Sequence, residues 1–431
     1  MNEWRKFILG CTVGNVLEWY DFILYGYFAH IFSVLFFPSS SEFLSLFLAY
    51  AVFAIGCVMR PVGSAFFGHI GDKLGRKKAL MITIILISLA TISMGLLPTY
   101  AEVGVAAPIL LTMCRLLQGM AVSGEEVGAA VFLTENAPLG RQGLAGAIIL
   151  SSVYTGLLLG AIVVFIVIYS FSHEALLSYA WRIPFLCSSV FGVIAFYIRM
   201  SDVESPKFIQ HSEKLHSLPF VQVVRHHLMA VVGTVALSAI LAVSIYLFVV
   251  YLPTFFTMTL YLSLQQALLV SVVALFVMSI LVLFVGLFAD RVGTRNVFAV
   301  GCLGFIAMAY PIFLLLSYKT FWGVFFAETL LIACLALIAG SIFPLLINNF
   351  PVDVCYTGVG LGFNIGMTVF GSTTPLIVMS LIQYTGSSTS PFWYLFFSAI
   401  VSFIALPFFT DGRPIILEDT FEGDMLLETA R

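Results

Sequence analysis

Twelve windows of mostly apolar residues run through this chain, and they restrict its fold more than any other feature. A helix needs about 20 residues to cross the ~30 Å of bilayer hydrocarbon, and backbone groups in lipid must find hydrogen-bond partners within their own segment, which excludes open strands. The windows lie near 7–37, 43–67, 79–98, 104–133, 143–170, 183–200, 228–256, 263–289, 296–317, 321–349, 357–383 and 391–410. We therefore predict an all-α, multi-pass membrane protein with twelve transmembrane helices.

The composition agrees with a chain that lies in the lipid bilayer. Apolar residues make up 61% of the 431 residues and charged residues 10%, whereas soluble domains have about 45–50% and about 25%. The net charge of −3 and the lack of a basic cluster argue against a nucleic-acid partner. The seven cysteines form neither CxxC nor a metal-ligand spacing, so we expect no disulfide and no metal.

Lysine and arginine fix the expected orientation of the helices. With both termini in the cytoplasm, fifteen of the 19 Lys and Arg residues lie in cytoplasmic segments, two lie outside and two lie within helices. A single missed helix would scramble this split, so it supports both the helix number and the direction. The first residues could pass for a signal peptide, but they lack a small-residue cleavage site, and we interpret them as the start of the first helix.

The two halves of the chain carry the same charged hairpin, which predicts two pseudo-symmetric six-helix bundles. Equivalent positions in the two copies lie 218 residues apart, about half of the chain. The residues are Gly68, Asp72, Gly75, Arg76 and Lys77 in the first copy and Gly286, Asp290, Gly293 and Arg295 in the second. We expect an N-terminal bundle over 1–200, a cytoplasmic linker over 201–226, a C-terminal bundle over 227–410 and a short acidic cytoplasmic tail over 411–431.

The hairpins have two interpretations. Asp72 and Asp290 each end an even-numbered helix at the cytoplasmic face, and a glycine three residues later allows a tight reversal. Basic side chains beside the aspartate could pair with it and lock a cytoplasmic gate, or they could serve only to hold the topology. We favour the gate, since topology needs no Asp and Gly in both halves. Thr294 stands in the second copy where the first has Arg76, which makes the second lock weaker.

Polar side chains inside the predicted helices of the first half are candidates for substrate and proton binding, because a lone charge there costs at least ~2.5–3.5 kcal/mol. They are Asn15, Glu18, Asp21 and Tyr25 in the first helix, Arg60 in the second, and Arg115, Gln118, Glu125 and Glu126 in the fourth. The first four fall within an arc of about 120°. On one continuous helix, Arg115 and Glu126 would point within about 20° of each other, about 16 Å apart. We predict a buried network that faces a central cavity.

This network also has two interpretations. A carboxylate could carry a coupled proton, since its proton affinity depends on burial and on its distance from Arg60 or Arg115. Alternatively, the charges only neutralise each other and fix helix packing. The second half contributes Tyr246, Tyr251 and Asn364, where the tyrosine rings could hold a quaternary ammonium group or simply pack. The internal arginines suit a substrate carboxylate, but they could equally serve the carboxylates beside them.

The motifs resemble a known family. The two hairpins resemble the signature loop of the major facilitator superfamily, and the chain as a whole resembles its metabolite:proton symporter family, which includes proline/betaine, α-ketoglutarate, citrate and shikimate transporters. The matching stretches are Gly14-Asn15 through Glu18-Trp19-Tyr20-Asp21-Phe22, Tyr25-Gly26, Arg60-Pro61 with Gly63, Arg115-Leu116-Leu117-Gln118-Gly119, Gly124-Glu125, Trp181-Arg182-Ile183-Pro184-Phe185, Glu204-Ser205-Pro206, and Asn364-Ile365 to Pro375. The chain departs from that pattern at Ser123, Glu126 and Cys355.

The resemblance implies the major facilitator fold, alternating access between its two bundles, and uptake of a small molecule with protons through a bacterial inner membrane. The implied energy source is the proton gradient, with no cofactor, and we expect a monomer. A proton-coupled antiporter that exports a drug or metabolite is the alternative, although the Gly-Pro-Gly-Gly signature common in helix five of antiporters is absent between Ser151 and Ser170. A membrane enzyme lacks an HExxH or GxSxG motif, and a non-transporting sensor lacks a signalling domain.

Overall fold

The structure is a computed structural model that describes residues 3–74, 76–138, 140–200, 219–258, 261–351 and 354–410. Within these ranges, side chains are not described at 3, 5–7, 68, 69, 71–74, 76–80, 198–200, 219, 258, 264 and 321. The described residues form helices joined by short loops, with no strand among them.

The first half forms six crossings, several of them built from more than one helix. These are α1 (Glu3–Tyr27) with α2 (Ala29–Phe36); α3 (Glu42–Leu74); α4 (Arg76–Leu96); α6 (Ala106–Val122) with α7 (Glu125–Glu135); α8 (Gln142–Ser170); and α9 (His173–Ala175) with the π-helical turn η1 (Leu176–Ala180) and α10 (Arg182–Met200). The short helix α5 (Tyr100–Val103) lies in the loop before α6.

The second half repeats this number of crossings. After α12 (Pro219–His226) come α13 (Leu228–Ile245) with the π-helical turn η2 (Tyr246–Tyr251) and α14 (Leu252–Met258); α15 (Leu264–Val292); α16 (Thr294–Ser317); α17 (Phe321–Ala339) with α18 (Ile342–Ile347); α19 (Cys355–Gly366) with the π-helical turn η4 (Met367–Ser372) and α20 (Thr374–Thr385); and α21 (Phe392–Ala405) with η5 (Leu406–Phe408).

Each of the twelve apolar windows coincides with one of these crossings, which confirms the predicted all-α membrane fold. Eight described helices are long and apolar enough to span a membrane by themselves, and the pair bent by 48° at α9–α10 makes nine. The other three crossings are α1, α4 and α21. The apolar parts of α4 and α21 are shorter, Met81–Leu96 and Phe392–Phe408, and α1 contains both Glu18 and Asp21.

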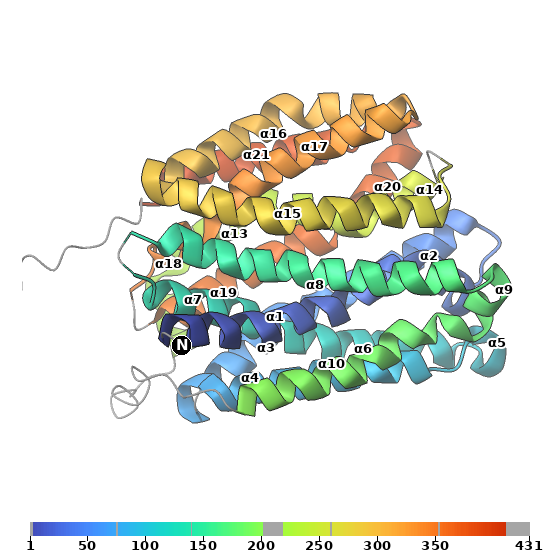
Figure 1. Ribbon diagram of the computed structural model, residues 1–431, viewed down its shortest axis with the longest axis horizontal. Helices are drawn as coiled ribbons and strands as arrows, with labels where there is room; N and C mark the ends of the chain where they lie inside the picture. The colour runs from blue at the N-terminus through green and yellow to red at the C-terminus, as the bar shows by residue number, and fades with distance from the viewer. Residues whose placement is uncertain are drawn as a thin grey trace, which may run out of the picture.

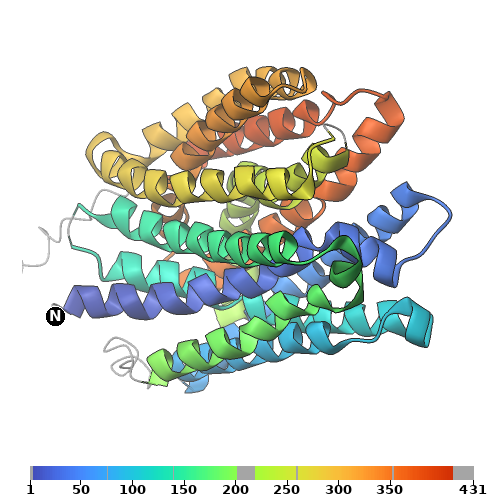
Figure 2. The ribbon, with the colours of Figure 1, turned by 45° about the vertical axis from the view of Figure 1, so that its right-hand side comes forward.

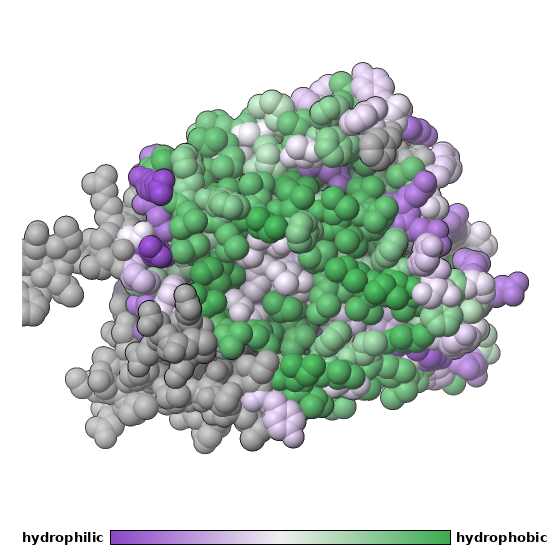
Figure 3. All heavy atoms as spheres, in the orientation of Figure 1, coloured by the Kyte–Doolittle hydropathy of each residue, from purple (hydrophilic) through white to green (hydrophobic). Residues whose placement is uncertain are grey.

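The helices gather into two groups that meet along α8 and α15 (Figure 1). In Figures 1 and 2, α15, α16, α17 and α21 lie on one side of α8, and α1, α4, α6 and α10 lie on the other. Figure 3 shows an apolar band across the middle of the visible face, with polar residues gathered at its two ends. A lipid bilayer fits this band, and large apolar side chains such as Phe276 and Phe284 of α15 are exposed to the surroundings.

The predicted division into 1–200, 201–226, 227–410 and 411–431 stays a prediction. The last eight residues of the predicted linker form α12. Residues 201–218 and the predicted tail lie outside the described part of the chain.

Two local features set the positions of the buried polar side chains. The fourth crossing is interrupted at Ser123 and Gly124, between α6 and α7. Arg115 and Glu126 therefore lie on two helices, since Glu125 begins α7, although Ser123 and Gly124 keep right-handed helical dihedral angles and the two helices form one apolar span. The second feature is the crossing of α3 and α6, where a Cβ on Gly119 would overlap the carbonyl oxygen of Gly56. This close approach brings the arginines of α3 and α6 into one buried region.

Candidate functional site

Arg60 joins the two halves of the molecule at the centre of the buried region. It lies in α3 and is fully buried. Its Nη2 forms an ion pair with Glu126 Oε2 at 3.6 Å, which is too long for a hydrogen bond. Its Nε donates to Asn364 Oδ1 at 3.1 Å and its Nη1 to Tyr246 Oη at 3.1 Å. Because Asn364 and Tyr246 belong to the second half, one guanidinium holds groups from both.

Asn364 adds a second link between the halves. Its amide nitrogen donates to the carbonyl of Ser123, at the break between α6 and α7, at 3.1 Å, and to that of Gly360 at 2.9 Å. Nearby, the Tyr356 hydroxyl donates to the Gly124 carbonyl at 2.8 Å. The interruption of the fourth crossing thus exposes backbone carbonyls that α19 of the second half binds.

Arg115 is buried in a different way. Its Nη1 donates to Gln118 Oε1, and the rings of Tyr25 and Phe53 lie 4.6 Å from its Cζ, with Phe22 at 4.9 Å. These cation–π contacts stabilise the charge in part. Nε and Nη2 have no hydrogen-bond partner among the described residues. Leaving a buried donor unsatisfied costs about 1–3 kcal/mol, and Arg115 is the described cation that has two such donors on one side chain.

Asp21 and Arg115 are both buried, yet they do not pair with each other. The Asp21 carboxylate accepts a hydrogen bond from the Ser188 hydroxyl at 2.8 Å, and its Oδ1 has no partner in the described part of the chain. Gln118 lies between the two, because it accepts from Arg115 and its Nε2 donates to the Asp21 backbone carbonyl at 2.9 Å and to Thr91 Oγ1 at 2.8 Å. A carboxyl so placed can gain or lose a proton without breaking an ion pair.

The remaining candidates of the first half face several helices. Asn15 donates to Ser152 Oγ of α8 at 2.8 Å, and the Tyr25 hydroxyl donates to the Ala49 carbonyl of α3 at 2.9 Å. Glu18 is buried in α1, and Glu125 accepts from the Thr83 hydroxyl of α4 at 3.4 Å. The structure thus brings Arg60, Glu126, Tyr246 and Asn364 together, while the role of every predicted site residue in binding stays a prediction.

The second hairpin makes a contact that the sequence did not indicate. The Asp290 carboxylate, at the end of α15, accepts hydrogen bonds from the backbone N–H groups of Gly143 at 2.6 Å and Leu144 at 3.0 Å. These N–H groups belong to the first turn of α8, where a negative charge is favourable. A Cβ on Gly143 would lie 2.8 Å from the Gly286 carbonyl oxygen, so the close approach depends on glycine. The partner of this aspartate is therefore a helix end in the other half.

The other predicted gate residues complete the hairpins only in part. Gly293 separates α15 from α16 with φ of 102°, a conformation that favours glycine, and Arg295 lies in the first turn of α16. In the first hairpin, Gly68 belongs to α3. Gly75 lies outside the described residues, as do the side chains of Asp72, Arg76 and Lys77.

The opposite end of the molecule has a groove between the halves. A cavity of about 250 Å³ lies between α3, α14 and α20 and is lined by residues that include Glu42, Tyr251, Thr254 and Gln383. Thr254 also hydrogen-bonds through its hydroxyl to that of Tyr50 at 2.7 Å. The sequence did not single out Tyr50 and Thr254, since a lone tyrosine or threonine in an apolar window has no distinctive pattern. Together they join the halves beside the groove.

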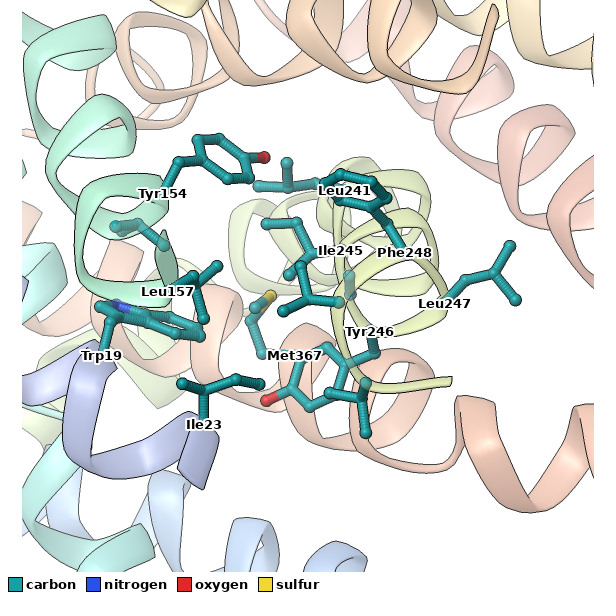
Figure 4. Close-up of a cluster of buried hydrophobic side chains, with 14 of the residues drawn as sticks. Trp19, Ile23, Tyr154, Leu157, Leu241, Ile245, Tyr246, Leu247, Phe248 and Met367 are labelled. Atoms are coloured by element: carbon teal, nitrogen blue, oxygen red, sulfur yellow. The ribbon is translucent and has the colours of Figure 1, made fainter. Parts of the chain in front are cut away.

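Between the two ends, the halves meet through apolar and aromatic side chains (Figure 4). Trp19 of α1 and Tyr154 of α8 face Ile245 and Phe248 of the second half, and Met367 of η4 lies among them. The Tyr154 hydroxyl points toward the second half and has no hydrogen-bond partner among the residues that the structure describes. Tyr246 of the same cluster accepts from Arg60, so this apolar region adjoins the charged site.

Comparison with known proteins places this geometry among membrane transporters. The family model described as sugar (and other) transporter matches residues 7–218. The proline/betaine transporter of Salmonella typhimurium is 31% identical, over 93% of this chain and 82% of the relative. The ectoine/proline transporter ProP of Corynebacterium glutamicum is 33% identical, over 96% of this chain and 85% of the relative.

Solved structures share the fold at lower identity. The proton:xylose symporter XylE bound to 6-bromo-6-deoxy-D-glucose superposes with a TM-score of 0.78 at 15% identity, over 94% of each chain. The inward open conformation of the xylose transporter XylE from E. coli gives a TM-score of 0.70 at 16% identity, over 96% of this chain and 98% of that chain. These matches establish the architecture. The chemistry of the site has to be inferred from the residues of this chain.

Proposed function

Because this chain belongs to the metabolite:proton symporter family of the major facilitator superfamily, we propose that it takes up a small zwitterion or organic acid together with protons, by alternating access. Membership of the family makes it a secondary active transporter and not an enzyme. A relative from Dickeya dadantii, 30% identical over 93% of this chain, carries the name glycine betaine/proline/ectoine/pipecolic acid transporter. All four of those compounds join a carboxylate to a nitrogen that is cationic at neutral pH.

One observation carries the proposal that protons and substrate share one equilibrium. The Arg60–Glu126 ion pair lies at the junction of the halves, and Arg60 also holds Tyr246 and Asn364 of the second half. Protonation of Glu126 would remove its charge and free Arg60, which would change the contacts between the halves. A proton can then bias the rocking of the bundles, because it binds the two arrangements with different free energies.

The contacts between the halves supply two candidate gates. Asp290 on Gly143 and Leu144 would close the end where α1 begins, and Tyr50 on Thr254 would close the end with the groove. Alternating access requires that each set of contacts break in turn. We assign the Asp290 end to the cytoplasm, with both termini, because the Lys and Arg residues gather in the segments of that end.

The proposal extends to the setting in which the protein works. We propose a monomer in a bacterial inner membrane, with the proton gradient as the energy source in place of a bound cofactor. Two of the relatives are transporters of Salmonella typhimurium and Dickeya dadantii. A multi-pass membrane protein with an apolar band across its middle agrees with this setting.

Reconstituted protein tests the proposal directly. Proteoliposomes loaded at high internal pH should accumulate a labelled proline, betaine or dicarboxylate above the external concentration when the outside is acidified, and a protonophore should abolish the accumulation. Uptake that ignores the pH gradient would contradict symport. Efflux driven by an inward proton gradient would instead support the antiporter, the alternative from the sequence.

A further inference from the structure

We propose that the free edge of the Arg115 guanidinium, formed by Nε and Nη2, binds the carboxylate of the transported substrate. This rests on the proposed function, since it names the group that would recognise the cargo of the same site. It also decides between the two arginines, which the sequence left equivalent.

Arg60 has no donor edge left for a ligand. Its Nε donates to Asn364, its Nη1 to Tyr246, and its Nη2 faces Glu126 at 3.6 Å. A carboxylate from outside would have to displace a carboxylate of the protein. Arg60 therefore serves the neighbouring groups, which is one of the two roles that the sequence allowed.

Arg115 is the opposite case. Its Nη1 is engaged by Gln118 Oε1 and, at 3.5 Å, by the Phe22 carbonyl, whereas Nε and Nη2 have no partner among the described residues. Between residues that the structure describes, Arg60–Glu126 is the one ion pair, and Arg115 takes no part in it. Arg115 is thus a fully buried positive charge whose compensation does not come from a described carboxylate.

The two free nitrogens are neighbours on one edge of the planar guanidinium. Two parallel N–H groups on such an edge match the two oxygens of a carboxylate, which gives a bidentate pair with fixed geometry. Gln118 acts as a positioning residue, because its bond to Nη1 fixes the plane of the guanidinium, and its other bonds tie it to Asp21 and Thr91. A lysine could supply the charge but not this fork.

The surroundings of Arg115 indicate what the rest of the substrate is like. Rings of Phe22, Tyr25 and Phe53 lie within 4.9 Å of its Cζ. Phe22 and Phe53 in turn contact the ring of Tyr246, from the second half, with centroids 6.3 and 5.8 Å apart. An aromatic wall beside a carboxylate fork suits a compact apolar or methylated ammonium body. It does not suit a sugar, whose hydroxyl groups need many hydrogen-bond partners.

The wild-type protein gives the first test, through pairs of compounds that differ in the carboxylate alone. Competition against a labelled carboxylate substrate is measured by counterflow without a pH gradient, which makes it independent of proton coupling. Proline should compete at least about tenfold better than prolinamide, and glycine betaine better than choline, because a site built for a hydrogen-bonded group rejects an analogue that lacks it. Equal competition by the amide or by choline would overturn the proposal.

Variants give the second test. Arg115→Lys keeps the charge and removes the fork, so the KM for the carboxylate substrate should rise at least about tenfold, while prolinamide competes as in the wild type. Arg182→Lys is the matched control, because Arg182 is a half-buried arginine that donates to the backbone carbonyls of Gly95 and Leu97, away from the site. Its KM should be unchanged. An unchanged KM in Arg115→Lys, in protein that melts as the wild type does, would also overturn the proposal.

The two proposals fail in different experiments. Preference for the carboxylate together with uptake that ignores the pH gradient would remove proton coupling and leave the role of Arg115 intact. Gradient-driven accumulation together with equal competition by prolinamide would support proton coupling and exclude the proposed role of Arg115. A ligand-induced rise in melting temperature in detergent, seen with proline but not with prolinamide, would support the role of Arg115 without any transport.

Discussion

The Asp290 carboxylate of α15 accepts a hydrogen bond from the backbone N–H of Gly143 at 2.6 Å, so that the end of one half caps a helix of the other. A second bond, from Leu144, makes the cap bidentate. A contact of this kind needs both helix ends within hydrogen-bond reach, which holds only while this end of the interface is closed. The cap therefore belongs to one of the two states of the transporter.

Asp290→Asn should weaken this cap and favour the state that is open at the same end. The amide keeps one acceptor but loses the charge that favours the helix end, which removes about 0.5–2 kcal/mol from the closed state. Thiol labelling of a single cysteine placed near Gly286 should become faster. Asn296→Ala is the control, since Asn296 of α16 lies at the same end and donates to the Val292 carbonyl at the end of α15, within the same half. Equal labelling in the two variants would reduce Asp290 to a structural cap.

Glu126→Gln should separate accumulation from exchange. The amide is always neutral, so it resembles a permanently protonated Glu126 that no longer forms the ion pair with Arg60. Accumulation against a gradient should fall to background, while counterflow without a gradient continues. Glu102→Gln, on the exposed helix α5, should leave both unchanged. Normal accumulation in Glu126→Gln would remove this residue from the proton path.

Asp21→Asn should flatten the dependence of transport on external pH. Asparagine fills the same space and can keep the bond from Ser188, but it cannot exchange a proton. Folding should change little, because no described cation pairs with Asp21. Initial rates measured from pH 5 to pH 8 give the result, and Ser188→Ala serves as the companion variant, in which the carboxyl remains. A wild-type pH profile in Asp21→Asn would assign the coupling to another carboxylate.

Tyr50→Phe should loosen the interface beside the groove. The change removes the bond to Thr254 Oγ1 and leaves the ring, at a cost of about 0.5–1.5 kcal/mol to the state in which this end is joined. Thr254→Val removes the same bond from the other side. If the hydroxyls act as one contact, the double variant should shift the outward-facing population no more than either single variant. Additive shifts would show that the two hydroxyls act separately.

Much of the architecture could be predicted because it depends on the length and spacing of apolar windows, which can be identified in the sequence alone. The apolar windows are set by bilayer thickness, and their limits agree with the helices closely, as at 143–170 against Gln142–Ser170. The interruption at Ser123 and Gly124 could not be predicted, since neither residue by itself breaks a helix. It arises where α19 of the second half binds the freed carbonyls.

The candidate site was also predictable only in part. Arg60, Arg115, Asp21 and Glu126 were identifiable as charges inside apolar windows. Their pairing was not, because Arg60 has partners more than 180 residues away in the chain at Tyr246 and more than 300 away at Asn364. The aromatic residues Phe22 and Phe53 were invisible for another reason. The chain has 42 phenylalanines, so no spacing in the sequence distinguishes the few whose rings lie against a guanidinium.

The π-helical turn η2 has a mechanical consequence. Tyr246 is the first residue of this turn and accepts a hydrogen bond from Arg60, while Tyr251 is its last residue and lines the groove opposite the Asp290 end. A π-helical turn carries one residue more than an α-helical turn, and losing that residue rotates everything beyond it by about 100°. Tightening η2 would therefore rotate Tyr251 relative to Tyr246. A shift of one residue in this turn would then couple the width of the groove to the hydrogen bond between Tyr246 and Arg60.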